Sequence, residues 1–210
     1  VFGLVLNKNI ENFVPFLLTG IITWRWLAVT VTRCSNSILS NAAFINRVYL
    51  PKILFPTVII LTETVKFMIS FCILIIFLNI YGLGVTIHYA ALVGVLFVEF
   101  IFITSIAFFF AAITPFFPDI QIILQNGLQL MFFLSGIFYR VDLIPMPYKN
   151  WFYLNPMVSI IENYRDILIY SQWPDLQSLY HVLLFSMLIL ILSAFIFRKF
   201  ERQYPRIVTS

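Results

Sequence analysis

Charged residues are scarce in this chain of 210 residues, where Asp, Glu, Lys and Arg make up 10% of the sequence. An average soluble domain carries roughly 25%. Hydrophobic residues account for 61%, and the mean hydropathy is +0.98. This composition excludes a soluble domain. It also lacks a basic run of the kind that binds nucleic acid, because the densest cluster, at 198–206, directly follows an apolar segment and is better explained by membrane topology.

The chain also lacks the motifs of several enzyme and metal-site classes. Cys34 and Cys72 have no CxxC spacing, so neither a disulfide nor a metal site is expected. No GxxxxGK followed by Ser or Thr occurs, so this chain should not bind ATP phosphates itself. The aspartates are scattered, and Ser135-Gly136 lacks the preceding Gly of an intramembrane serine protease. We therefore expect no catalytic residue and no cofactor on this chain.

Long apolar stretches dominate what remains. A helix needs about 20 mostly apolar residues to cross a bilayer core, and five stretches qualify or nearly do: 13–32, 53–78, 90–114, 120–139 and 179–197. They are far too long for strands, and an open sheet would leave unpaired backbone groups in lipid. The predicted fold class is an all-α integral membrane protein, with one transmembrane domain over residues 1–210. We interpret the apolar stub at 1–6 as the end of a further hydrophobic segment.

The distribution of Lys and Arg predicts the orientation of the helices. The C-terminal tail and the connection 33–52 are both basic, whereas the longer connection 140–178 has fewer basic residues for its length. We therefore expect the tail and 33–52 on the cytoplasmic side, and 140–178 outside.

The external connection has structure of its own. Asn155 can cap a helix and Pro156 can occupy its first turn. Apolar residues then recur at helical spacing on one side, while Glu162, Arg165 and Asp166 are assigned to the other. This pattern predicts an amphipathic helix lying on, or dipping into, the outer leaflet.

In their order, these features resemble the permease subunits of type-2 ABC transporters that export O-antigen, capsular polysaccharide or teichoic acid. The matching stretches are FLLTGI at 16–21 with Trp24, SI at 37–38 with Asn41, VYLPK at 48–52 with FP at 55–56, FLSGIFY at 133–139, YLNPM at 153–157 and YRD at 164–166. The resemblance runs nearly end to end. It implies six spans, of which the first is truncated here, in a bacterial cytoplasmic membrane. It also implies that two copies form a channel, driven by two copies of a separate ATPase that holds ATP and Mg²⁺.

The resemblance assigns roles to both connections. A coupling helix at about 41–50 would dock on the ATPase, with Asn41, Arg47, Pro51 and Lys52 as candidate contacts. Two external gate helices would occupy 143–153 and 155–170, and the gate candidates are Tyr153, Asn155, Pro156, Arg165 and Asp166. Simpler roles are also open: Asn41 as a helix cap, Arg47 and Lys52 as positive-inside anchors, and Arg165–Asp166 as a structural clamp within the gate helix.

Four charges lie inside the predicted spans, where each costs about 3 kcal/mol on insertion scales; they are Arg25, Glu63, Lys66 and Glu99. Arg25 either meets the pyrophosphate of a lipid-linked glycan or forms an ion pair with Glu63 or Glu99, with the flanking indoles of Trp24 and Trp26 packed around it. Glu63 and Lys66 are three residues apart and should neutralise each other. Glu99 has no partner in its own helix and must face another span or a wet cavity.

A polar stripe on the fourth predicted span consists of Gln121, Gln125 and Gln129, with Asn126 beside it. Such a face should point away from lipid, toward a sugar hydroxyl or a neighbouring helix. The channel candidates are therefore Trp24, Arg25, Glu63, Glu99, Gln125 and Gln129.

Together these features predict the permease subunit of an ATP-driven exporter of lipid-linked polysaccharide such as O-antigen. One alternative keeps the fold and changes the cargo to teichoic acid or a hydrophobic drug. A second is a secondary transporter in which Glu63 or Glu99 carries a coupling proton. A third is a purely structural membrane subunit.

Overall fold

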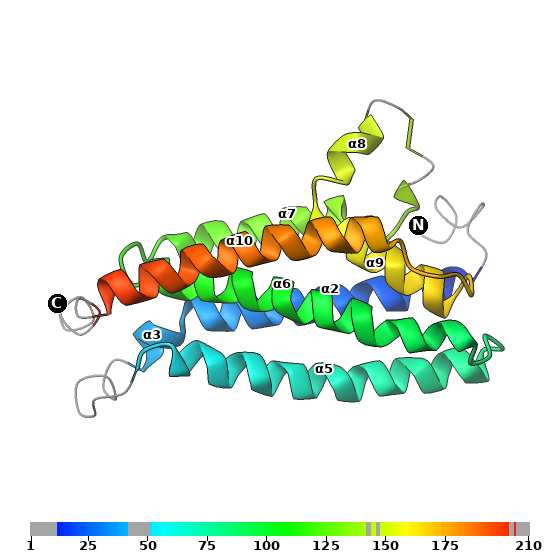
Figure 1. Ribbon diagram of the computed structural model, residues 1–210, viewed down its shortest axis with the longest axis horizontal. Coiled ribbons are helices and arrows are strands. Elements are labelled where there is room, and N and C mark those ends of the chain that lie inside the picture. The colour runs from blue at the N-terminus through cyan, green and yellow to red at the C-terminus, as the bar shows by residue number, and fades with distance from the viewer. Residues whose placement is uncertain (1–11, 42–50, 142–143, 146–147, 202–203, 205–210) are drawn as a thin grey trace. The chain divides into compact units, whose positions relative to one another are not determined.

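The computed structural model describes residues 12–41, 51–141, 144–145, 148–201 and 204, and these ranges contain helices and turns but no strand (Figure 1). The helices are α2 (Phe13–Ser35), α3 (Ser37–Ser40), α5 (Leu54–Ile80), the 3₁₀ helix η2 (Ile87–Ala91), α6 (Leu92–Ile113), α7 (Ile120–Leu134), α8 (Tyr148–Phe152), α9 (Pro156–Leu168) and α10 (Leu176–Phe200). The prediction of an all-α fold is confirmed for the described residues.

Four helical segments are long and apolar enough to cross a membrane: Phe13–Ser35, Leu54–Ile80, Ile87–Ile113 and Leu176–Phe200. The fifth apolar helix, α7, has 15 residues and ends at Leu134. At about 1.5 Å per residue it is shorter than a bilayer core of about 30 Å. The prediction that this helix continues to residue 139 is therefore wrong.

The backbone at Gly136 explains why α7 ends early. Gly136 has a φ of +67°, a left-handed backbone conformation that residues with a side chain rarely adopt. A Cβ atom at this position would lie 2.6 Å from Cγ2 of Val141. The chain thus turns sharply in a way that requires glycine, and no helix can run through it.

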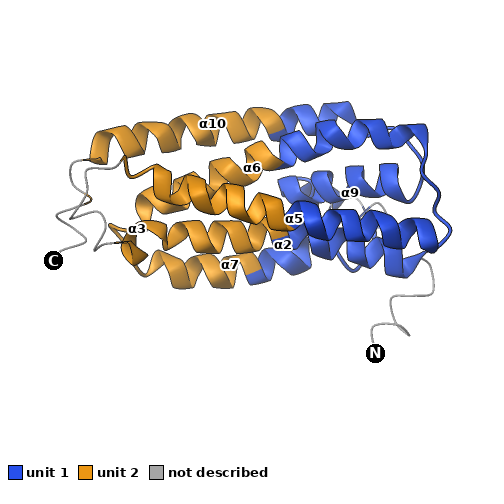
Figure 2. Ribbon diagram, turned by 90° about the horizontal axis from the view of Figure 1, so that it is seen from below, with its two compact units in different colours: residues 1–25, 67–99, 129–182 blue, residues 26–66, 100–128, 183–210 orange. Residues whose placement is uncertain are grey.

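The chain forms two compact units (Figure 2). Unit 1 consists of residues 1–25, 67–99 and 129–182, and unit 2 of residues 26–66, 100–128 and 183–210. Both units contain a segment of each of five helices, which are α2, α5, α6, α7 and α10. In unit 2, the Phe116 ring packs against those of Phe200 and Tyr204, and the Tyr204 hydroxyl donates a hydrogen bond to the Ala112 carbonyl (3.1 Å).

Helix α9 forms where the sequence predicts the second gate helix, but its environment differs from the prediction. Asn155 caps it by accepting from the Met157 amide at 3.1 Å, and Pro156 occupies the first turn. Ten of its 13 residues are buried, including Arg165, so the helix is not a surface amphipathic helix with a polar outer side. Helical spacing cannot predict this burial, because it contains no information on the segments that surround the helix.

The other predicted connection helices are described only in part. Helix α8 covers five residues of the predicted 143–153 segment, of which 143 and 146–147 lie outside the described residues. In the predicted coupling segment, Asn41 ends the short helix α3, where its amide donates to the Ser37 carbonyl (2.8 Å). Residues 42–50, including Arg47, lie outside the described part of the chain.

Candidate functional site

Arg165 anchors α9 to two other parts of unit 1. Its side chain is 3% exposed. Nε and Nη2 donate to the Phe16 carbonyl of α2 (3.3 and 3.2 Å), Nη1 donates to the Gly136 carbonyl (2.9 Å), and Nη2 donates to the Ile137 carbonyl (3.1 Å). The guanidinium carbon also lies 3.3 Å from the centroid of the Phe16 ring. These hydrogen bonds go to backbone carbonyls across the unit, and the clamp between Arg165 and Asp166 stays a prediction.

Two of the three carbonyls are available because they are not needed for a helix. The Gly136 and Ile137 carbonyls lie in the turn after α7, beyond the end of the helical hydrogen-bond ladder. Three partners and a ring face compensate a buried cation that would otherwise be costly. Burial lowers the pKa of the Arg165 guanidinium to about 9, which leaves it charged at neutral pH.

Gly20 allows α2 to approach this anchor closely. A Cβ atom at residue 20 would lie 2.9 Å from Nη2 of Arg165 and 3.4 Å from Cγ2 of Ile137. Because three carbonyls fix the guanidinium, it has little freedom to move aside. The absence of a side chain at residue 20 is thus part of the anchor.

A second buried polar contact holds α9 against α6. The Tyr164 hydroxyl donates to Oε2 of Glu99 at 2.6 Å, and both side chains are fully buried. The Phe71 ring of α5 packs edge-on against the Tyr164 ring, with centroids 5.6 Å apart. Among the described residues, Oε1 of Glu99 has no hydrogen-bond partner. Glu99 therefore faces α9, a helix of the connection, which is neither of the two surroundings (another span or a wet cavity) that the sequence left open.

Asn155 connects the start of α9 to the end of α7. While its side-chain oxygen caps α9, its amide donates to the Ser135 hydroxyl at 2.8 Å. The Ser135 hydroxyl in turn donates to the Met131 carbonyl of α7 (2.6 Å). Arg165, Tyr164 and Asn155 thus give three polar attachments of α9 to α2, α6 and the end of α7, and Asn163 adds a bond from its amide to the Ser178 hydroxyl of α10 (3.0 Å). These contacts fix the helix within unit 1.

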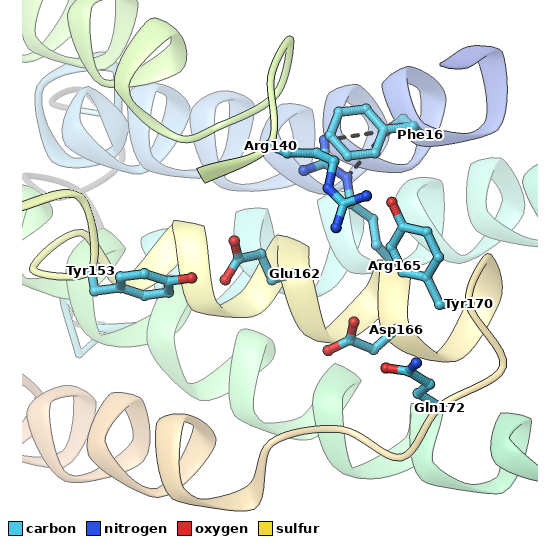
Figure 3. Close-up of a pocket in the computed structure, with 8 residues that line it drawn as sticks. All are labelled: Phe16, Arg140, Tyr153, Glu162, Arg165, Asp166, Tyr170 and Gln172. Atoms are coloured by element: carbon cyan, nitrogen blue, oxygen red, sulfur yellow. Dashed lines mark hydrogen bonds between the residues drawn. The ribbon is translucent and has the colours of Figure 1, made fainter. Parts of the chain in front are cut away.

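Beside the anchor lies a cavity of about 520 Å³ (Figure 3). It is lined by Phe16, Arg140, Tyr153, Glu162, Arg165, Asp166, Tyr170 and Gln172. The Tyr153 hydroxyl points toward Glu162, and the Arg140 guanidinium lies 5.5 Å from the centroid of the Tyr170 ring. The lining therefore combines two cations, two carboxylates, an amide and aromatic rings.

In unit 2, Glu63 lies between two cations. Its Oε1 atom is 2.7 Å from Nη1 of Arg33 and 2.7 Å from Nζ of Lys66. The predicted Glu63–Lys66 pair is confirmed, and Arg33 joins it from α2. The side chain of Glu63 is 8% exposed, whereas those of Arg33 and Lys66 are 56% and 53% exposed.

Arg25 does not form the ion pair that the sequence favoured. Glu63 is paired with Arg33 and Lys66, and Glu99 accepts from Tyr164. The Arg25 side chain is exposed and forms no ion pair with any described residue. Neighbouring side chains on a helix point in different directions, so the two indoles are buried elsewhere and do not enclose the guanidinium.

The two indoles each pack against a phenylalanine. The Trp24 ring lies 6.0 Å from that of Phe132, and the Trp26 ring lies 6.4 Å from that of Phe100. The Trp24–Phe132 contact brings α2 beside α7 in unit 1.

The glutamine stripe of α7 is divided between two environments. Gln121 donates to the side-chain oxygen of Asn36 (3.1 Å), just beyond the end of α2. Gln125 and Gln129 are exposed on the surface of the single chain, as is Asn126. The helix is otherwise apolar, so its exposed polar side chains need a covering other than lipid.

The remaining candidates form no common site in the described structure. Pro51 is exposed, and Lys52 is buried near the start of α5. Among the described residues, no group of three or more His, Cys, Asp or Glu side chains could hold a metal ion. Both cysteines are free.

Sequence reasoning missed the partners that complete the anchor and the cavity. Gly20 and the carbonyls of Phe16, Gly136 and Ile137 give no chemical signal in a sequence, because glycines and apolar residues are common in spans. The available signals were three matching stretches of the resemblance: FLLTGI at 16–21, FLSGIFY at 133–139 and YRD at 164–166. The resemblance singled them out without indicating that their residues contact one another. Arg140, Tyr170 and Gln172 lie in connections, where spacing says little about spatial neighbours.

The four long apolar helices and the composition define a multi-pass membrane protein, whose described residues form helices and turns without a strand. Residues 1–169 match the family model of the ABC-2 type transporter, and the chain belongs to that family. It is thus a transmembrane subunit of that family.

Three related proteins have names that are more specific than the family description. An O-antigen export system permease protein RfbA of Klebsiella pneumoniae is 27% identical over 168 residues, which is 80% of this chain and 65% of that protein. RfbA of Myxococcus xanthus is 26% identical over 206 residues (97% and 79%), and the polysialic acid transport protein KpsM of Escherichia coli is 24% identical over 206 residues (96% and 79%). The chain spans about 65% of the length of the Klebsiella relative.

Proposed function

We propose that this chain is the membrane-spanning permease subunit of an ATP-driven exporter that moves a lipid-linked polysaccharide, O-antigen or a similar glycan, across the bacterial cytoplasmic membrane. Family membership supports the permease role, and the names of the three relatives support a glycan cargo. In the proposed assembly, two copies of the chain work with two copies of a separate ATPase.

The observation that carries the proposal is a polar surface on helices that are otherwise apolar. Arg25 on α2 and Gln129 on α7 are exposed in unit 1, where Trp24 and Phe132 bring the two helices together. Gln125 is exposed one turn away from Gln129 on the same helix. Lipid cannot satisfy such groups, so a water-filled path or a second copy must cover them. A path between two copies would present these groups to sugar hydroxyls and to the pyrophosphate of the carrier.

We further propose that α8 and α9 are the external gate helices, with Tyr153, Asn155, Pro156, Arg165 and Asp166 in the gate. The three attachments of α9 support a gate that is held at a defined position in the closed state. The segment 33–52 would couple the permease to the ATPase on the cytoplasmic side through Asn41, Arg47, Pro51 and Lys52. The basic C-terminal tail would lie on that same side.

Two rival functions are distinguished by their energy source and cargo. Family membership favours ATP over a proton gradient, and Glu63, one candidate proton carrier, is engaged by two cations. A teichoic acid or drug exporter would keep the same fold, and only the cargo assay separates it from a polysaccharide exporter.

The first experiment is purification of the full-length protein from its native host in mild detergent. We expect an ATPase containing GxxxxGK followed by Ser or Thr to co-purify in equal ratio, and to be lost when residues 41–50 are replaced. Depletion of the permease in the same host should remove polysaccharide from the cell surface and leave lipid-linked chains inside. A permease that purifies alone, with export that collapses when only the proton gradient is removed, would refute the proposal.

A further inference from the structure

The cavity beside Arg165 has a chemistry that is unusual for the surface of a membrane protein. Glu162 and Asp166 lie one helical turn apart on α9, and both line it. Arg140 and Tyr170 form its opposite part as a cation–aromatic pair, and Gln172 and Tyr153 are exposed at its margin. All of these residues belong to unit 1. The volume of about 520 Å³ lies within the range of about 300–1,000 Å³ typical of small-molecule sites.

We propose that this cavity binds a neutral saccharide of the exported chain, an inference that rests on the proposed function. Sugar hydroxyls both donate and accept hydrogen bonds, so they can donate to the carboxylates of Glu162 and Asp166 and accept from the guanidinium of Arg140 and the amide of Gln172. The apolar faces of a sugar ring pack on aromatic rings, and the Tyr153 ring is partly exposed for this contact.

The same lining disfavours other ligands. A pyrophosphate or an acidic sugar would meet the negative charges of Glu162 and Asp166 as well as the positive charges of Arg140 and Arg165, and the Arg165 guanidinium already donates to three backbone carbonyls. An acyl chain would remove water from four charged groups without replacing their hydrogen bonds. A neutral, polyhydroxylated ligand fits the balanced charge of the cavity.

The position of the cavity suggests what the site does. Its residues come from α9, from the start of α2 and from the connections before, between and after the gate helices. In the proposed topology these segments lie at the external side. Binding at this site would hold the leading sugars of the exported polysaccharide after they have passed the gate. This would oppose movement of the polysaccharide back toward the cytoplasm.

The binding test uses the full-length permease with its ATPase in lipid nanodiscs and saturation-transfer difference NMR. The probes are two neutral oligosaccharides, maltotriose and chitotriose, and one acidic oligosaccharide, sialyllactose. We expect at least one neutral probe to bind better than sialyllactose. Glu162→Gln and Asp166→Asn should each weaken that binding about tenfold, as expected for loss of a hydrogen bond to a charged group.

Two further variants keep the result interpretable. Gln172→Ala, in an exposed connection, should also weaken binding even if the α9 variants fail to assemble. Gln177→Ala is the matched control, because Gln177 is exposed at the start of α10 and does not line the cavity. Co-purification of the ATPase checks that each variant is assembled. The inference is overturned if the assembled wild type binds no neutral probe, if sialyllactose binds best, or if Gln172→Ala and the assembled α9 variants bind as the wild type does.

An export assay separates this inference from the proposed function. If the wild type exports polysaccharide and no probe binds, the exporter proposal stands and the saccharide site is refuted. If probes bind at the cavity but depletion leaves surface polysaccharide unchanged, the exporter proposal fails.

Discussion

Arg165 in unit 1 and Glu63 in unit 2 are both buried charges, and their partners are of different kinds. Arg165 is held by three backbone carbonyls and a ring face, all supplied by packed segments of the same unit. Glu63 is held by two long side chains that are about half exposed. Backbone partners cannot move without moving the fold, whereas side-chain partners can adjust. Arg165 therefore fixes the arrangement of unit 1, and the ion group of unit 2 mainly neutralises charge.

The two units also differ in the sign of the charges that their sequences contain. Eight of the 13 Lys and Arg residues belong to the segments of unit 2, whereas six of the nine Asp and Glu residues belong to those of unit 1. Excess basic residues near the ends of spans set the topology of membrane proteins. Unit 1, in contrast, holds the Arg165 anchor, the Tyr164–Glu99 contact and the cavity. In the predicted topology, most basic residues of unit 2 would lie at the cytoplasmic side, whereas Arg165 and Glu99 of unit 1 hold α9 in place.

The largest effect should come from Arg165→Lys. A lysine cannot reach three carbonyls with a planar fork, so buried acceptors would lose their donor. We expect a loss of about 3–5 kcal/mol in the free energy of unfolding, the range for breaking a buried charged interaction. SDS titration of the purified protein with circular dichroism measures it. Arg25→Lys is the control, because Arg25 is exposed and should change stability little. Equal effects of both substitutions would show that Arg165 is not an anchor.

Tyr164→Phe should have the next largest effect. It removes the hydroxyl that donates to Oε2 of Glu99 and leaves the carboxyl without a described partner. We expect a loss of about 1–3 kcal/mol, the cost of an unsatisfied buried group. Glu99→Gln should cost less, because an amide oxygen still accepts from Tyr164. The same titration compares the two variants, and a larger loss for Glu99→Gln would mean that the negative charge itself is needed.

Gly20→Ala should have a smaller effect on stability, and it tests the close approach of α2 to the Arg165 guanidinium. The new Cβ atom would press on the fixed Arg165 guanidinium, while the helix itself would gain up to about 1 kcal/mol from the better helix former. Overpacking typically costs about 1–3 kcal/mol, so a net loss of about 1–2 kcal/mol is expected. Gly94→Ala is the matched control on α6, where no atom lies within 4 Å of the Cβ position, and it should not destabilise.

A double-mutant cycle identifies the partner of the new methyl group. In an Arg165→Met background the guanidinium is gone, so Gly20→Ala should lose most of its cost. A cost that persists there would point to Ile137, which is the other close neighbour of this position.

The parts of this structure that could be predicted from the sequence are those that depend on local spacing. The Asn155 cap, the extent of α9 and the Glu63–Lys66 pair all follow from residues within one helical turn or one helix. The Tyr164–Glu99 bond joins residues 65 positions apart, and the Arg165–Phe16 bond joins residues 149 apart. Periodicity carries no information about such partners. It assigned Arg165 to a polar face because an arginine is usually exposed, whereas here carbonyls from other segments compensate its burial.

The smallest effect should come from Lys66→Met. The Lys66 side chain is 53% exposed, and its loss leaves Glu63 paired with Arg33. Exposed pairs within a helix contribute about 0.3–0.5 kcal/mol, so a loss of no more than about 0.5 kcal/mol is expected in the same SDS titration. The combination with Arg33→Met should be far more harmful than either single change, because Glu63 would then be buried without a cation. Additive effects of the two changes would contradict the view that either cation alone can neutralise Glu63, and the contrast between adjustable side-chain partners and fixed backbone partners would then not hold.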